Sequence, residues 1–149
     1  ATTIDLKTIL LTKVFILHKV NGFSRNLRKE ITKSSKWYFY DNGLRNALIA
    51  NLVPIDQRND IVMLWENYVI AERIKFQQYE RMLVNNYFWR TYDQQEIDWV
   101  EERGGHLYGY EFKWNPNKKA KVPAAWQKTY EQSSFEVIHR DNYLEWMGN

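Results

Sequence analysis

The sequence contains no cysteine, which excludes disulfide bonds and every zinc or iron–sulfur site that depends on cysteine ligands. Its three histidines, His18, His106 and His139, lie too far apart to match the short ligand spacings of zinc sites, so zinc is not expected. A chain without cysteine suits a reducing compartment, and we therefore expect a cytoplasmic location.

Long apolar runs are also missing. The longest run near the start, "ILLTKVFIL", is interrupted by Lys13 and is far shorter than the ~20 residues that a membrane-spanning helix needs. We therefore expect no membrane partner. The chain begins without methionine and opens directly into a patterned segment, so we interpret it as a fragment of a longer protein.

Aromatic residues, in contrast, are abundant. They make up 16% of the 149 residues and include seven tryptophans and ten tyrosines, a composition that indicates a packed globular protein of one domain or slightly more. Charge is uneven, since residues 1–50 carry nine basic against three acidic side chains, whereas residues 51–149 carry twelve against fifteen. The first part presents either a nucleic-acid-binding face or an ordinary solvated basic surface.

A connector rich in turn-forming residues, "NLVPIDQRN", divides the chain near residues 51–59. Before it, residues 1–50 show a helical pattern, a short apolar strand, a basic turn and the strand "KWYFY". This order is typical of the end of a winged helix, a module that places basic groups against DNA phosphates. We therefore predict a partial winged-helix-like segment over 1–50 and a second domain over 51–149.

The second domain begins with the most periodic segment of the chain. Residues 60–83 lack glycine and proline and predict a long helix. Three strand-like segments follow at 87–92, 95–102 and 106–114, the last two joined by the turn "RGG". A short helix at 124–132 and a strand at 135–140 complete the order helix, three strands, helix, strand, and "NYLEWM" closes the chain. This order predicts an α/β fold with a small mixed sheet flanked by helices.

Glu66 is out of place in the long helix. Its neighbours on the helix surface, three and four residues away, are Val62, Met63, Val69 and Ile70. A carboxylate in an apolar stripe is desolvated at a cost of several kcal/mol unless a partner offsets it. Glu66 therefore either pairs with an arginine or backbone group inside the core, or faces a metal ion or base across the sheet.

A second acid, Asp98, interrupts the apolar strand "EIDWV", where aspartate is unfavourable unless it lies at a bulge, at an edge or in a site. In "GYEFKWN", Glu111 and Lys113 share the strand face opposite to the aromatic side chains. A tight hairpin brings Asp98 close to both. Carboxylates and a nearby lysine suit metal-assisted hydrolysis of a phosphodiester, because Mg²⁺ prefers oxygen ligands and a lysine stabilises the transition state.

Aspartate, a gap of about a dozen residues and then Glu-x-Lys resembles the motif of the PD-(D/E)XK nuclease superfamily, with Ile97 where the superfamily name has proline. The segments "KWYFYDNGLRNALI", "LWENYVIAERIK", "YFWRTYDQQEIDWV" and "YEFKWN" together resemble the C-terminal domain of unknown function of bacterial and archaeal AAA+ class ATPases. The resemblance implies a restriction-endonuclease-like fold, with Glu66, Asp98 and Glu111 as ligands of Mg²⁺ or Mn²⁺ and Lys113 as a fourth catalytic residue. It also implies DNA as substrate and an ATPase domain of the same protein as partner.

Two functions remain open at this point. The chain is either a metal-dependent DNA nuclease coupled to an ATPase, or a non-catalytic DNA-binding or assembly module of that ATPase which keeps the nuclease fold. No Gly-x-x-x-x-Gly-Lys-[Ser/Thr] motif occurs, so ATPase activity is not expected from this chain. The basic residues considered for nucleic-acid contact, each of which also suits a solvated or structural role, are Arg90, Lys118, Lys119, Arg25 and Arg28.

Overall fold

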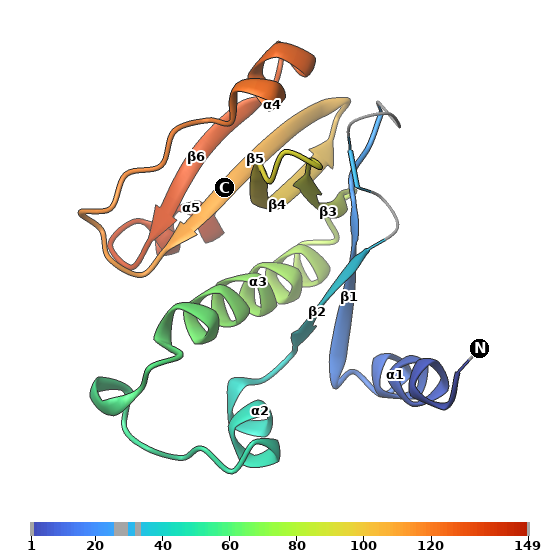
Figure 1. Cartoon of the computed structure of the whole chain (residues 1–149), viewed down its shortest axis with the longest axis vertical. Coiled ribbons are helices and arrows are strands. Elements are labelled where there is room, and N and C mark those ends of the chain that lie inside the picture. Colours follow the sequence, from blue (N-terminus) through green and yellow to red (C-terminus); the bar gives the residue numbers. More distant parts are fainter. Residues whose placement is uncertain (1, 26–29, 32–33, 149) are drawn as a thin grey trace.

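The computed structural model describes residues 2–25, 30–31 and 34–148. The order expected after residue 59, helix, three strands, helix and strand, is confirmed, whereas α2 and η1 were not predicted (Figure 1). The elements are α1 (Thr3–Lys13), β1 (Leu17–Gly22), β2 (Ser35–Phe39), α2 (Asn42–Leu48), the 3₁₀ helix η1 (Ile55–Gln57), α3 (Ile61–Tyr79), β3 (Asn85–Arg90), β4 (Glu96–Arg103), β5 (His106–Lys113), α4 (Ala124–Thr129), β6 (Ser134–His139) and α5 (Tyr143–Met147).

The strands form one mixed six-stranded sheet in the order β2-β1-β3-β4-β5-β6. The pairs β1–β3 and β5–β6 are parallel, and the other neighbours are antiparallel. Because β1 and β2 belong to this sheet, the division near residue 50 does not separate two sheets. The helix, strand, strand order expected for residues 1–50 is present as α1, β1 and β2, and its winged-helix assignment stays a prediction.

The β4–β5 hairpin has the geometry that the sequence predicts. Arg103 pairs with His106, so Gly104 and Gly105 alone make the turn. Their φ angles of 58° and 77° lie in the left-handed region that glycine adopts without steric cost. This tight turn fixes the register of the two strands that carry Asp98, Glu111 and Lys113.

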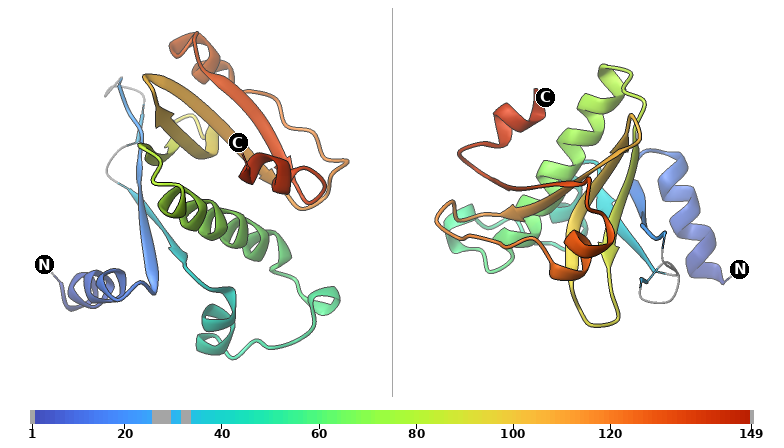
Figure 2. Two further views of the ribbon diagram at one scale, coloured as in Figure 1. Left: turned by 180° about the vertical axis from the view of Figure 1, so that it is seen from behind. Right: turned by 90° about the horizontal axis from the view of Figure 1, so that it is seen from above.

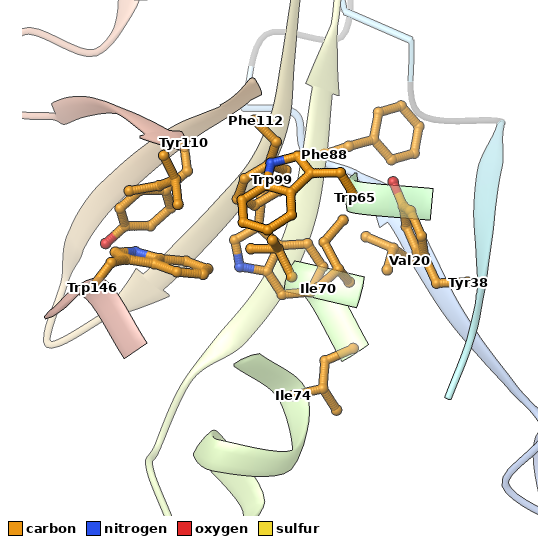
Figure 3. Close-up of a cluster of buried hydrophobic side chains, with 12 residues drawn as sticks. Val20, Tyr38, Trp65, Ile70, Ile74, Phe88, Trp99, Tyr110, Phe112 and Trp146 are labelled. Atoms are coloured by element: carbon orange, nitrogen blue, oxygen red, sulfur yellow. The ribbon is translucent and has the colours of Figure 1, made fainter. Parts of the chain in front are cut away.

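Two aromatic clusters form the core, one on each face of the sheet. Figure 3 shows the cluster between α3 and the sheet, where Tyr110 and Phe112 of β5 pack with Trp65, Trp99 and Trp146. The cluster on the other face is built around Trp126 of α4. Tyr110 and Phe112 therefore share a buried face, as their alternation in "GYEFKWN" predicts.

Helix α3 lies across one face of the sheet, as the views in Figures 1 and 2 show. Val69 and Ile70 are fully buried, whereas Val62 and Met63 are 57% and 63% exposed. The expected apolar stripe around Glu66 is therefore wrong for the first turn of the helix, which lies outside the buried face. Asp60 occupies the N-cap position but makes no capping hydrogen bond with its side chain.

In the described part of the chain, no helix is long and apolar enough to cross a membrane. Helix α1 lies at the periphery, next to β1, and contributes no buried residue (Figure 2).

Candidate functional site

A bulge in β4 positions Asp98. Tyr87 pairs with Val100 and Trp89 pairs with Ile97, so one residue of β3 faces two residues of β4, Asp98 and Trp99. Such a bulge turns a side chain out of the regular alternation of the strand. The Asp98 carboxylate accepts a hydrogen bond from the backbone N–H of Phe112 at 2.9 Å, which fixes its position against β5.

Glu111 and Lys113 follow on β5. The pairing of Trp99 with Tyr110 places Asp98 opposite Glu111 in the same register, and their carboxyl groups lie within interaction distance. Lys113 donates a hydrogen bond from Nζ to Glu111 Oε1 at 2.6 Å. The hairpin therefore brings Asp98, Glu111 and Lys113 together, as their spacing predicts.

Glu66 reaches the same group from α3. The Tyr38 hydroxyl donates a hydrogen bond of 2.8 Å to Glu66 Oε1, and the Glu66 carboxylate interacts electrostatically with Asp98. Glu66 is therefore neither paired with a core arginine nor surrounded by apolar side chains alone. The four predicted residues converge at one end of the β4–β5 hairpin, although they span residues 66–113.

Two further charged residues at this place were not predicted as members of the site. Lys36 of β2 lies 2.5 Å from Glu96 Oε1 and 3.8 Å from Glu66 Oε1, measured from Nζ. Its ammonium group also lies over the ring of Phe88, 5.3 Å from the ring centre. Glu96 could have been found from the sequence, because it stands two residues before Asp98 in the same strand. Nothing in the sequence links Lys36 to β4.

Three carboxyl groups at the site, those of Glu66, Asp98 and Glu111, have a raised pKa. Burial and the negative charge of Asp98 raise the pKa of both Glu66 and Glu111 above the ordinary glutamate value. Burial also raises the pKa of Asp98, against the hydrogen bond from Phe112 and the charges of Lys36 and Lys113. The three residues therefore form an acidic cluster in which burial and mutual repulsion destabilise the ionised carboxylates.

The same acids raise the pKa of Lys36. Burial opposes its ammonium form, but Glu66, Glu96 and Asp98 together outweigh burial and raise the pKa of Lys36. Burial and the neighbouring Glu66 carboxylate also raise the pKa of Tyr38, so its hydroxyl stays a hydrogen-bond donor at neutral pH.

The donor chemistry of the cluster fits a hard divalent cation, since Glu66, Asp98 and Glu111 offer carboxylate oxygens and repel one another. The spacing is not that of a closed metal centre. Among the residues that the structure describes, no three acidic or histidine side chains lie close enough together to hold a metal ion. A cation at this site would have to draw the carboxylates away from the lysines that now contact them.

A cavity of about 410 Å³ opens beside Glu66. It runs between β2 and the first half of α3, and both Lys36 and Glu66 contribute to its wall. The side chains that line it are Lys36, Trp37, Tyr38, Phe39, Arg45, Met63, Glu66 and Asn67. Of the acids of the cluster, Glu66 is the one that faces this cavity.

The residues considered for nucleic-acid contact are dispersed. Arg90 borders the cluster, with its Nε 3.8 Å from Glu96 Oε2. Lys118 and Lys119 are exposed in the loop that follows β5. Arg25 pairs with Glu102 at 2.6 Å, and Arg28 lies outside the described residues. Of these five, Arg90 alone is shown beside the candidate site.

Comparison with known proteins gives two family matches. A family model described as a domain of unknown function, DUF4143, matches residues 63–143 and thus spans α3 to β6. A second one, DUF8612, also described as a domain of unknown function, matches residues 1–55. The acids of the cluster fall within the first match, and Lys36 and Tyr38 fall within the second.

Curated relatives include two uncharacterised proteins, one from Mycobacterium bovis and one from Mycobacterium tuberculosis. Each is 27% identical over 107 residues, which cover 69% of this chain and 23% of the relative. The chain therefore spans about a quarter of the length of these relatives. No solved structure matches it significantly.

Proposed function

Because the chain belongs to the family described as domain of unknown function DUF4143, we propose a function from the site itself: metal-dependent hydrolysis of DNA phosphodiesters at a PD-(D/E)XK-type centre. The observation that carries the proposal is the meeting of Asp98, at the β4 bulge, with Glu111 and Lys113 on β5. The approach of Glu66 from α3 completes the set of residues that the resemblance implies.

The roles follow from the chemistry of each side chain. Asp98 and Glu111 would hold the cation, with Glu66 on its outer side, because hard cations are bound by carboxylates that face one another. When bound, such a cation supplies positive charge for the phosphate and acidifies a water molecule. Lys113 would orient the attacking water and offset charge that develops on the phosphate in the transition state.

Cleavage of plasmid DNA with Mn²⁺ tests this proposal, with wild type, Asp98→Asn and Lys113→Ala compared at matched purity. Asp98→Asn should lose both metal binding and cleavage. Lys113→Ala should keep metal binding and cleave roughly 10²–10³ times more slowly, the scale seen when one preorganised electrostatic donor is lost. A contaminating nuclease would cut equally in all three preparations.

A second function rests on a specific observation. Lysines contact the acids, through Lys36 with Glu96 and Lys113 with Glu111, and the described residues contain no group of three metal ligands. These contacts also suit a non-catalytic DNA-binding or assembly module of an ATPase, in which the acids serve packing. Absence of cleavage of DNA and RNA, even in the full-length protein with its ATPase domain, would favour this alternative.

A further inference from the structure

Lys36 faces three of the acids of the cluster, Glu66, Glu96 and Asp98. Its Nζ lies 2.5 Å from Glu96 and 3.8 Å from Glu66, and its side chain is 27% exposed. Asp98 adds a third negative charge within electrostatic range. The ammonium group therefore faces three carboxylates that come from α3 and β4.

The lysine reaches these acids from a different part of the chain. β2 is the edge strand of the sheet and is separated from β4 by two strands, β1 and β3. The Lys36 ammonium lies over the ring of Phe88 and contacts Glu96. Lys36 belongs to the segment matched by one family model, and the acids belong to the segment matched by the other. The cluster is thus neutralised across the division between these two segments.

We propose that Lys36 is a built-in counter-cation of the acidic cluster, and that a divalent cation enters the cluster only by displacing its ammonium group. The inference rests on the proposed metal site. A cation within ligand distance of Glu66 and Asp98 would lie a few ångströms from the present position of Lys36 Nζ, and two positive charges at that separation repel each other strongly. The ammonium and the metal therefore exclude one another.

The same contacts account for the open spacing of the carboxylates. Glu96 and Glu66 are directed toward Lys36, and Glu111 is directed toward Lys113. Because two separate ammonium groups attract these acids, the carboxylates are not directed toward one common point. Loss of Lys36 should remove the ammonium group that competes with a metal ion for these carboxylates, while the Tyr38 hydroxyl still holds Glu66.

Titration of the chain with Mn²⁺ by calorimetry tests the proposal on the variant Lys36→Met, which keeps an unbranched side chain without its charge. The variant should bind Mn²⁺ at least about tenfold more tightly than wild type, a difference of about 1.4 kcal/mol. Lys19→Met is the matched control, because Lys19 lies on the neighbouring strand β1 with its ammonium 5.5 Å from the Trp37 ring centre. Its exposed side chain should leave Mn²⁺ affinity unchanged.

The results distinguish the proposed role of Lys36 from the proposed metal site. Equal or weaker binding by Lys36→Met, with measurable binding by wild type, would overturn the role of Lys36 and leave the metal site standing. Absence of Mn²⁺ binding in wild type and in both variants would overturn the proposed metal site, and the displacement of Lys36 with it.

A measurement on the wild-type chain covers the case in which Lys36→Met does not fold. Acetylation of lysine amines by an activated ester, followed by mass spectrometry, reports how freely each ammonium group can react. Saturating Mn²⁺ should speed acetylation of Lys36 several-fold and leave Lys19 unchanged, since displacement frees the Lys36 amine from its acids. An unchanged Lys36 rate, at a Mn²⁺ concentration that raises the melting temperature, would overturn the proposal.

Discussion

Arg73 of α3 and Glu101 of β4 form a bidentate ion pair, with distances of 2.7 and 2.9 Å, in a place where neither side chain is exposed to solvent. Gln77 and the indole of Trp99 donate further hydrogen bonds to Glu101 Oε1. The pair joins α3 to β4 and does not belong to the candidate site. A buried ion pair of this kind contributes little net stability but is costly to break from one side.

The first prediction concerns this pair. Glu101→Gln keeps the shape of the side chain but removes the charge that balances Arg73, and it should lower the free energy of unfolding by about 3–5 kcal/mol. The double variant Arg73→Met with Glu101→Leu should lose less, because no uncompensated charge stays buried. Urea unfolding of the three proteins measures both effects. If the unfolding free energy of Glu101→Gln lies within about 1 kcal/mol of wild type, the pair behaves like a solvent-exposed ion pair.

The second prediction follows from the raised pKa of Glu66, Asp98 and Glu111. The folded protein holds these protons more tightly than the unfolded chain, so without metal the stability from this cluster is greatest at low pH. It should be lost as pH rises from about 4, the ordinary carboxyl range, through the raised folded-state values.

Asp98→Asn should flatten this decline, because it removes one titrating acid and relieves the repulsion on the other two. Urea unfolding at intervals between pH 4 and 7 measures the slope. Glu72→Gln, an exposed position on α3 that is paired with Lys75, serves as the control. If Asp98→Asn follows the wild-type curve, the three carboxyl groups do not titrate as a coupled set.

The third prediction concerns the basic segment before β2. If residues 1–50 contact DNA, duplex binding should weaken steeply with salt, and each phosphate contact contributes a slope of about −0.9 in log–log form. Replacing Arg25, Arg28 and Lys29 with glutamine should weaken binding and reduce the slope by up to about three. Fluorescence anisotropy at several salt concentrations measures this.

Two points bear on the interpretation of that experiment. Arg25 is paired with Glu102, so this ion pair should offset part of its contribution to DNA binding, whereas Arg28 and Lys29 lie outside the described residues. Asp98→Asn should leave the slope unchanged, since it removes no cation. Equal affinity and slope after the triple replacement would show that this segment is a solvated basic surface and does not contact DNA.

The sequence predicts local relationships well in this protein. Asp98 in an apolar strand indicates a bulge, an edge or a functional site, because aspartate is unfavourable in a regular ladder, and the structure has a bulge at that residue. The glycines of "RGG" fix the hairpin, and the hairpin brings Asp98 to Glu111 and Lys113. Alternation along β5 separates these charges from the buried Tyr110 and Phe112.

Relationships between distant segments are not predictable in this way. The parallel pairing of β1 with β3 joins Asn21 and Gly22 to residues 87–88, and no spacing rule links these positions. This pairing, together with the packing of α3 on β2, brings Lys36 within reach of Glu96, so the sequence could not reveal Lys36 as part of the cluster. The exposure of Val62 and Met63 has a similar origin, since helix periodicity does not show where a helix leaves the sheet.

The attachment of the β1–β2 hairpin has a consequence for local stability. β1 and β2 share five register pairs, but β1 and β3 share only two. The hairpin is also joined to α3, where Asn67 exchanges two hydrogen bonds with the backbone of Phe39 and Glu66 accepts one from Tyr38. The hairpin can therefore open as one unit at a smaller free-energy cost than β4 or β5. Each such opening separates Lys36 from the acids. The attraction between Lys36 and these acids therefore contributes to the free energy of opening the hairpin, and any change in the charge of the cluster also changes how often this edge of the sheet opens.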